Sequence, residues 1–174
     1  MASRELETER LIFRIPTRAD FDDSAAMWGD PEVTRHIGGK PSTREDSWAR
    51  LLRNIGHWHV QEFGYWVVRD RSGRYLGEVG FADWKREMEP RLEYPEAGWV
   101  LATHAHGKGF ATEAVTAFLA WGEERFGHGK ASAIIDPGNT ASMRVAEKCG
   151  FVRQPDGVFR GSPIMMFLRS TAPR

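Results

Sequence analysis

Cysteine is nearly absent from this sequence, which has only Cys149 among its 174 residues. A single cysteine excludes a disulfide within the chain and fits the reducing environment of the cytosol. No run of about 18 consecutive apolar residues is present, so a membrane-spanning helix is not expected. The first residues, Met1 to Glu7, also lack the apolar segment of a secretion signal. Together these absences predict a cytoplasmic protein with no membrane partner.

An excess of charge of either sign is lacking too, because 24 basic residues balance 24 acidic ones. Such a chain has no overall attraction for nucleic acid, and no nucleic-acid partner is expected. Spacing typical of metal ligands is also missing, since His57 and His59 lie two positions apart and would not face each other on a helix. We therefore expect no metal.

The pattern of apolar residues predicts alternating strands and helices in one domain that spans residues 1–174. Thr17 and Thr43 are expected to begin the first two helices, with Asp46 completing a capping pair and Gly64 closing the second segment. Strands are expected at residues 9–15, 65–69, 75–81, 96–101, 131–135, 151–153 and 164–168, and further helices at about 110–126 and 139–149. This order indicates an α+β or mixed α/β fold. Residues 170–174 are expected to be a frayed tail.

The most informative segment is the glycine-rich turn that starts at His106 and leads into the predicted helix. Gly107 and Gly109 lack a Cβ and allow close approach of a ligand to the backbone. The start of a helix offers unpaired N–H groups and a positive dipole end, which suit phosphate. The segment fits neither the P-loop pattern nor the dinucleotide pattern, because Thr112 stands where the latter needs glycine. On this motif alone, a turn that merely joins a strand to a helix remains an alternative.

Four blocks of sequence carry a wider resemblance. They are Thr8–Arg14, Trp28–Gly38, Glu96–Leu101 with the glycine turn after it, and Asn139–Phe151. In order and spacing they resemble the GCN5-related N-acetyltransferase (GNAT) superfamily, in particular its branch of ribosomal-protein N-terminal acetyltransferases. One departure is His106, which stands where the superfamily usually has Gln or Arg. Its side chain is expected either to contact phosphate or to be a partly exposed turn residue.

The resemblance implies a three-layer fold in which helices flank a central, mostly antiparallel sheet that splays open. It also implies acetyl-CoA as the co-substrate, with its pantetheine arm in the open part of the sheet. The residues implied to bind it come from one strand, the glycine turn and two helix starts: Trp99, Val100, Leu101, His106, Gly107, Lys108, Gly109, Phe110, Ala111, Thr112, Asn139 and Ser142. The implied reaction is direct attack of an amine on the thioester in a ternary complex.

The attacking amine has to lose a proton, so a carboxylate near the thioester is the expected base. Glu96 is the first candidate and Glu78 the second, because both lie on predicted central strands, and Asp83 is weaker. Each carboxylate has the plainer alternative of a solvated strand residue. Asn139 can cap the helix that follows it and still hydrogen-bond the pantetheine arm, since its amide has both donors and an acceptor. Ser142 lies one helical turn after Asn139 and is the candidate for stabilising the leaving thiolate, or else a second capping residue.

The acceptor amine is expected to be a protein N-terminus or a small molecule. Its pocket is expected between the first two helices and the last hairpin, with aromatic and histidine side chains available there: Trp28, His36, Trp48, His57, Trp58, His59 and Trp84. The alternative function is a GNAT-fold module that binds acyl-CoA as a sensor without turnover. The sequence leaves open whether the chain forms a homodimer.

Overall fold

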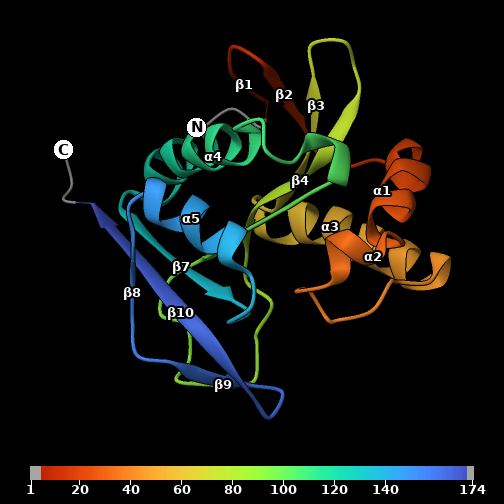
Figure 1. Ribbon diagram of the computed structural model, residues 1–174. Coiled ribbons are helices and arrows are strands. Elements are labelled where there is room, and N and C mark those ends of the chain that lie inside the picture. Colours follow the sequence, from red (N-terminus) through yellow and green to blue (C-terminus); the bar gives the residue numbers. More distant parts are fainter. Residues whose placement is uncertain (1–4, 172–174) are drawn as a thin grey trace.

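The computed structural model describes residues 5–171, which form one mixed α/β domain (Figure 1). The helices are η1 (Arg18–Asp20), α1 (Phe21–Trp28), α2 (Pro31–Thr34), α3 (Arg44–Gln61), η2 (Thr103–Ala105), α4 (Phe110–Phe126) and α5 (Thr140–Lys148). The strands are β1 (Leu6–Glu7), β2 (Leu11–Arg14), β3 (Tyr65–Asp70), β4 (Tyr75–Ala82), β5 (Met88–Glu89), β6 (Glu96–Leu101), β7 (Gly129–Ile135), β8 (Phe151–Arg153), β9 (Gly157–Phe159) and β10 (Ser162–Thr171). Within these residues no helix has the length and apolarity needed to cross a bilayer.

The strands form one sheet in the order β1-β2-β3-β4-β6-β7-β10-β9-β5, with β8 paired to β10. Every pairing among the described strands is antiparallel except that of β6 with β7. That parallel pair is in register only at Glu96 and Ser132, where the Ser132 N–H also donates to the carbonyl of Pro95 at 3.0 Å. The two strands separate beyond this point, so the sheet splays between β6 and β7.

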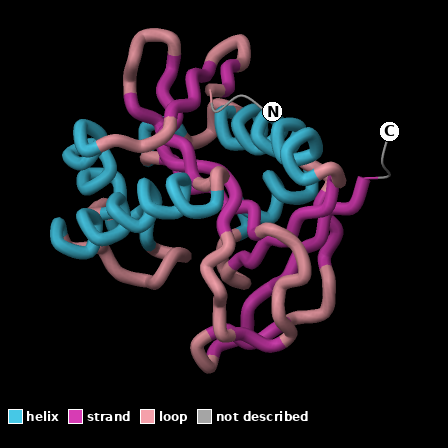
Figure 2. The backbone as a smooth tube through the Cα atoms, turned by 180° about the vertical axis from the view of Figure 1, so that it is seen from behind, coloured by secondary structure: helices cyan, strands magenta, loops and turns pink. Residues whose placement is uncertain are grey.

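Helices cover both faces of this sheet (Figure 2). Successive side chains of a strand point to opposite faces, and β3 shows the consequence. Trp66 packs in the larger core cluster with Val115 and Phe118 of α4, whereas Val67 packs in the smaller cluster with Met27 of α1. The sheet therefore lies between a layer containing α4 and α5 and a layer containing α1 and α2. The expected fold class is confirmed.

Several local expectations need correction. Residues 170 and 171 are not frayed, because Ser170 and Thr171 pair with Lys130 and Gly129 as the end of β10, while residues 172–174 lie outside the described residues. Residues 18–20 form a 3₁₀ turn before α1 begins. The capping pair of Thr43 and Asp46 begins α3 as expected. The short elements α2, β1, β5 and β9 were not predicted, because segments of two to four residues show no apolar period.

The second long helix, α3, ends differently from the prediction. Glu62, with φ of 60°, takes the left-handed position at its end rather than Gly64. Gly64 has another role, since a Cβ there would lie 2.7 Å from the ring of Trp58. The missing side chain lets this indole pack into the core and donate its Nε1–H to the carbonyl of Tyr65 at 2.8 Å.

Candidate active site

A cavity of about 800 Å³ opens where β6 and β7 separate. Its walls include six of the predicted site residues, which come from β4, β6 and the start of α5: Glu78, Glu96, Trp99, Val100, Asn139 and Ser142. The structure thus brings together residues that lie up to 64 positions apart in sequence, as Glu78 and Ser142 do. From Ala97 onward the β7-facing edge of β6 is not paired with β7, and unpaired strand edges present backbone N–H and C=O groups.

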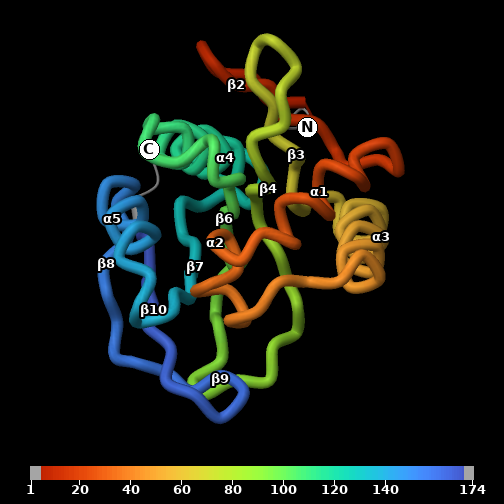
Figure 3. The backbone as a smooth tube through the Cα atoms, turned by 45° about the vertical axis from the view of Figure 1, so that its right-hand side comes forward, coloured from red at the N-terminus to blue at the C-terminus, as the bar shows by residue number. Residues whose placement is uncertain are grey.

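The loop after α2 passes across the open end of this splay (Figure 3). His36 Nδ1 lies 3.5 Å from Asp136 Oδ1 in the loop after β7. A Cβ on Gly138 would lie 3.0 Å from the same imidazole ring. The chain between α2 and α3 therefore touches the loop that leads into α5 and forms part of the cavity wall.

The predicted glycine turn lies between η2 and α4. Gly107 and Gly109 have φ of 71° and 78°, a backbone conformation that L side chains rarely adopt. Gly109 is the residue before α4 and has no side chain to cap it, and the first intrahelical bond runs from the Glu113 N–H to the Gly109 carbonyl at 3.1 Å. The N–H groups of the first turn before Glu113 therefore have no intrahelical partner, as an anion site requires.

Side chains around the turn hold it in place. The Nε2 of His106 lies 2.8 Å from the carbonyl oxygen of Leu101, so this nitrogen carries the proton and donates. The ammonium of Lys108 donates to the carbonyl of His104 at 2.9 Å. The ring of His106 thus ties the turn to the end of β6, and both side chains are engaged within the protein.

Arg10 of the segment before β2 braces the same turn and was not predicted. Its Nη1 donates to the carbonyl of Lys108 at 3.0 Å, and its Nε donates to Glu113 Oε2 at 2.6 Å. The guanidinium also stacks over the ring of Phe110, 4.6 Å from the centroid. Only the fold brings Arg10 here, since nearly 100 positions separate it from the turn.

Asn139 has the dual character that the sequence suggested. Its Oδ1 accepts from the Ser142 N–H at 3.1 Å and caps α5. The amide group can still donate through Nδ2, and both residues line the cavity. Ser142 is half-buried.

Glu96 is buried at the start of β6 and pairs with Arg86. Its Oε2 accepts from Nε at 2.6 Å and its Oε1 from Nη2 at 2.8 Å, a bidentate pair. Each oxygen keeps one further acceptor position. Tyr65 borders this carboxylate, and a Cβ on Gly98 would lie 1.9 Å from its hydroxyl oxygen. Burial, with a contribution from the charge of Glu96, raises the pKa of Tyr65, so its hydroxyl stays protonated.

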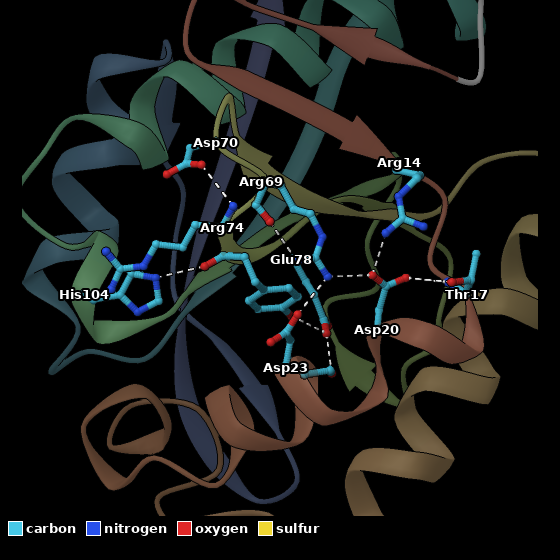
Figure 4. A network of polar contacts seen from close by, with 12 residues as sticks. Arg14, Thr17, Asp20, Asp23, Arg69, Asp70, Arg74, Glu78 and His104 are labelled. Atoms are coloured by element: carbon cyan, nitrogen blue, oxygen red, sulfur yellow. Dashed lines mark hydrogen bonds and ion pairs between the residues drawn. The ribbon is translucent and has the colours of Figure 1, made fainter.

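Glu78 is also buried but is fully occupied by neutral donors (Figure 4). Its Oε1 accepts from Ser24 Oγ at 2.5 Å and from the Tyr75 hydroxyl at 3.0 Å. Its Oε2 accepts from Trp28 Nε1 at 3.2 Å and from Asn54 Nδ2 at 3.5 Å. These contacts tie β4 to α1 and α3 and form one wall of the cavity.

Asp83, the weaker candidate base, and the single cysteine, Cys149, lie outside the cavity wall. Asp83 accepts from Lys85 Nζ at 2.6 Å, and this hydrogen bond lowers the pKa of its carboxyl group. Cys149 is half-buried against the core beside Thr112 and Thr116, and burial raises the pKa of its thiol. Within residues 5–171 there is no cluster of side chains that could hold a metal ion.

Of the aromatic and histidine residues expected in the acceptor pocket, Trp28, His36 and Trp84 line the cavity. The others do not: Trp48, His57, Trp58 and His59. His57 instead receives a hydrogen bond from the Asp83 N–H at 3.0 Å and contacts the carbonyl of Phe63. Several polar wall residues were not predicted from the sequence, among them Arg50, Arg53, Asn54, Tyr65 and Arg86. Three of these lie on α3 at the spacing of one helix face, which is a signal that the sequence did carry.

A sheet that opens at one parallel pair of strands, with a glycine turn and a helix start beside the opening, defines an acyltransferase of the GNAT class. The chain belongs to the acetyltransferase (GNAT) domain family, whose model matches residues 10–152. It is therefore an acyltransferase that depends on acetyl-CoA.

Relatives of similar length support this assignment. The chain is 35% identical over 159 residues to the uncharacterized protein YkkB of Bacillus subtilis, covering 86% of each chain. It is 27% identical over 157 residues to the uncharacterized N-acetyltransferase p20 of Bacillus licheniformis, covering 89% of this chain and 85% of the relative. A putative GNAT-family acetyltransferase from Bordetella pertussis has a similar structure, with a TM-score of 0.83 and 31% identity over 97% of this chain and all of the other.

Two solved structures with known acceptors share the fold at lower identity. One is the spermidine N-acetyltransferase of Vibrio cholerae in complex with CoA and spermine, with a TM-score of 0.74 and 18% identity, covering 95% of this chain and 98% of that one. The other is the ribosomal-protein-S5-alanine acetyltransferase of Vibrio fischeri, with a TM-score of 0.71 and 21% identity, covering 97% of each chain. At such identities the likeness shows the fold alone, so it does not select an acceptor.

Proposed function

We propose that this protein is a cytoplasmic N-acetyltransferase that transfers the acetyl group of acetyl-CoA to a primary amine in a ternary complex. The observation that carries the proposal is the unpaired edge of β6, which opens into the cavity and whose last residue, Leu101, is tied to the glycine turn by His106. The family assignment supports the acyl transfer. Two buried carboxylates, Glu78 and Glu96, line the cavity and support an amine as the acceptor.

The residues along the splay fit the co-substrate. The uncapped N–H groups from Gly107 to Thr112 would hold the pyrophosphate. Backbone groups of Trp99, Val100 and Leu101 would hydrogen-bond the pantetheine arm, and the amide of Asn139 would add a side-chain contact. When bound, acetyl-CoA supplies an activated thioester carbonyl. A β6 N–H near Trp99 would stabilise the negative charge that develops on its oxygen.

Glu96 is the proposed base. Of the two buried carboxylates it keeps an unused acceptor position on each oxygen, whereas the four donors around Glu78 occupy that carboxylate. Glu96 would accept the proton of the amine directly or through one water molecule. Glu78 would instead position the wall residues Trp28 and Asn54, with Tyr75 as a further donor behind them.

Ser142 is the proposed donor to the leaving thiolate, since its side chain lines the cavity on the α5 side of the splay. A hydroxyl can donate one hydrogen bond, which stabilises developing negative charge on sulfur. Replacing it with alanine should lower the rate without a large change in the affinity for CoA.

Release of free CoA thiol from acetyl-CoA, followed with a panel of primary amines, tests the proposal. Turnover that needs both acetyl-CoA and an amine supports it. The melting temperature measured with CoA and with acetyl-CoA separates the alternatives. A rise in melting temperature without turnover on any amine would indicate a binding module, and no rise with either ligand would contradict the proposed site.

A further inference from the structure

The acceptor half of the cavity is rich in arginine. Its walls carry Arg50 and Arg53 from α3, Arg86 from the segment before β5, and Arg160 from the turn between β9 and β10. Arg86 is neutralised by Glu96 at 2.6 Å. Among residues 5–171, Arg50 and Arg53 have no carboxylate within ion-pair distance. Two guanidinium groups therefore face the cavity without a bound counter-charge.

Both guanidinium groups are held by aromatic rings. Arg50 lies 3.7 Å from the ring centroid of Trp28, and its Nη1 donates to Ser42 Oγ at 3.2 Å. Arg53 lies 4.3 Å from the ring centroid of Trp84. Stacking on a ring fixes the plane of a guanidinium and leaves the N–H groups at its edge free to donate. The two side chains are thus arranged in advance to bind an anion.

The surroundings favour a negative ligand electrostatically. Burial lowers the pKa of Arg50 and outweighs the opposing charge of Glu78, and the neighbouring charge of Arg53 lowers that pKa further. The pKa of Arg53 is lowered as well, chiefly by burial, and the charges of Arg86 and Arg160 add to this lowering against the opposing influence of Tyr65 and Glu78. Solvent reaches Arg53 from outside, so an anion can reach it too. A bound anion would relieve this concentration of like charge.

Asn54 adds an acceptor for the amine end of the same ligand. It follows Arg53 on α3, is 3% exposed and lines the cavity. Its Oδ1 has no hydrogen-bond partner within residues 5–171, although its Nδ2 donates to Glu78. A buried acceptor without a donor is costly, and an N–H of a bound ammonium group would satisfy it.

We infer that the acceptor is an amine that also carries an anionic group, a carboxylate or a phosphate, which Arg50 and Arg53 bind while the amine faces Glu96. This inference rests on the proposed acetyltransferase function and narrows its substrate class. Polyamines are the opposite class, because their additional ammonium groups would meet the unpaired arginines.

Acetyl transfer to matched pairs of amines tests the substrate class. The carboxylate arm compares glycine, β-alanine and 4-aminobutyrate with the amide of each, and the phosphate arm compares phosphoethanolamine with ethanolamine. Spermidine is added to the panel as an amine that carries several positive charges and no anionic group. We expect kcat/KM at least tenfold higher for the anionic member of one pair than for its neutral match. A preference for the carboxylate or for the phosphate compounds identifies the anion that the site binds. The preferred member among glycine, β-alanine and 4-aminobutyrate indicates the distance between the anionic group and the amine in the site.

Substitution of the arginines locates the effect. Arg53→Gln should raise KM for the anionic acceptor at least tenfold and leave its neutral match nearly unchanged, and Arg50→Gln should act in the same direction. Arg53→Lys should restore only part of the affinity, since an ammonium lacks the planar fork. Arg91→Gln is the matched control, because Arg91 is exposed and lies outside the cavity wall. Melting temperatures of all variants show whether each is folded.

The outcomes keep this inference separate from the proposed function. Acetyl transfer that favours the neutral amides or spermidine would overturn the anionic acceptor and leave the enzyme intact. If no amine is acetylated, the melting temperature of the CoA complex is measured with and without 4-aminobutyrate and with and without phosphoethanolamine. This measurement shows whether the anion site binds either ligand. A rise with either that Arg53→Gln abolishes would retain the anion site and refute the turnover, and no rise would refute both.

Discussion

The cofactor side and the acceptor side of the cavity are built in different ways. The cofactor side consists mainly of backbone groups from short continuous segments. The edge of β6 and the start of α5 belong to the cavity wall. The glycine turn and the start of α4 lie outside that wall and are tied to the end of β6 through His106 and Leu101. The acceptor side consists of side chains from α1, α3, β3, β4 and the β9–β10 turn, which only the fold brings together. A backbone site tolerates most side-chain changes, whereas a side-chain site can be altered by one substitution. Evolution within such a fold can therefore change the acceptor while the co-substrate stays the same.

The largest effect is expected for Glu96→Gln, because an amide cannot accept the proton of the amine. The rate constant kcat should fall by about 100-fold or more, which is the usual contribution of a general base. The affinity for CoA should stay unchanged, because the backbone groups of the cofactor side are untouched. Single-turnover acetyl transfer and equilibrium binding of CoA measure the two quantities.

The control for this variant has to break an arginine–carboxylate pair elsewhere. Glu123→Gln does so, since Glu123 pairs with Arg169 at 2.7 Å and lies outside the cavity wall. It should lower the melting temperature without lowering kcat. Full activity of the Glu96→Gln protein would show that Glu96 is not the base. The acceptor side would then supply no carboxylate to the proposed chemistry.

The next largest effect is expected for Gly107→Val on the cofactor side. Gly107 and Gly127 have the same φ of 71° and flank α4 at its two ends, and a Cβ at either position would have no heavy atom within 4 Å. Valine at either site should therefore cost a similar free energy of unfolding, about 1–2 kcal/mol for the left-handed backbone. Only Gly107→Val should also weaken CoA binding, by about tenfold, since it places a side chain where the pyrophosphate would lie.

Differential scanning fluorimetry checks the equal loss of stability, and isothermal titration with CoA checks the unequal loss of affinity. Equal CoA affinity of the Gly107→Val and Gly127→Val proteins would place the pyrophosphate elsewhere. The backbone character of the cofactor side would then need revision.

The same difference explains what could be predicted from the sequence. The glycine turn, the strand Glu96–Leu101 and the Asn139 cap are local patterns, and each is found where the sequence predicted it. The resemblance also supplied the splayed sheet, which no local pattern could show. Glu78 and Glu96 both proved to be buried on central strands, but their hydrogen-bond partners come from distant elements and were not predictable.

The acceptor side was harder to predict for a physical reason. An arginine on an amphipathic helix is normally solvated. The sequence shows that Arg50 and Arg53 share a helix face, but this spacing does not show that the face lines a cavity. Arg44 of the same helix instead pairs with Asp22 on the surface. Trp84, the ring that holds Arg53, follows a strand on another part of the chain. Such a contact depends on tertiary packing, whereas the spacing of glycines in a turn does not.

Acid should loosen the acceptor side through Asp20, which is completely buried and accepts hydrogen bonds from Arg14 and Arg69 (Figure 4). Burial alone would raise the pKa of Asp20, but hydrogen bonds from Thr17 and Arg69 and the charge of Arg14 outweigh it and lower the pKa. A carboxyl group whose pKa is lowered by folding stabilises the protein above its unfolded pKa. That stabilisation is lost as the pH falls through the folded pKa.

The variant Asp20→Asn isolates this contribution. At pH 7 it should lower the free energy of unfolding by about 1–3 kcal/mol, since hydrogen bonds to a charged group are lost. The melting temperatures of the two proteins should begin to converge below about pH 4, because the unfolded carboxyl group has a pKa of about 3.9, and should continue to converge as the pH falls through the lower folded pKa. A difference in melting temperature that stays constant from pH 7 to pH 3 would show that the charge of Asp20 is not responsible.

The smallest effect is expected for Arg10→Ala, which tests whether the cofactor side depends on any side chain at all. Arg10 contacts the Lys108 carbonyl, Glu113 and the ring of Phe110, so its loss should leave the glycine turn less well ordered. We expect the Kd for CoA to rise by only a few fold, because His106 and Lys108 still hold the turn, and the KM for the acceptor to stay unchanged. Arg71→Ala is the matched control, because the side chain of Arg71 is 47% exposed and that of Arg10 is 45% exposed. Arg71 pairs with Glu7, with 2.8 Å between Nη1 and Oε2, and lies outside the cavity wall. A loss of CoA affinity as large as that of Gly107→Val would mean that the cofactor side, like the acceptor side, is held by side chains.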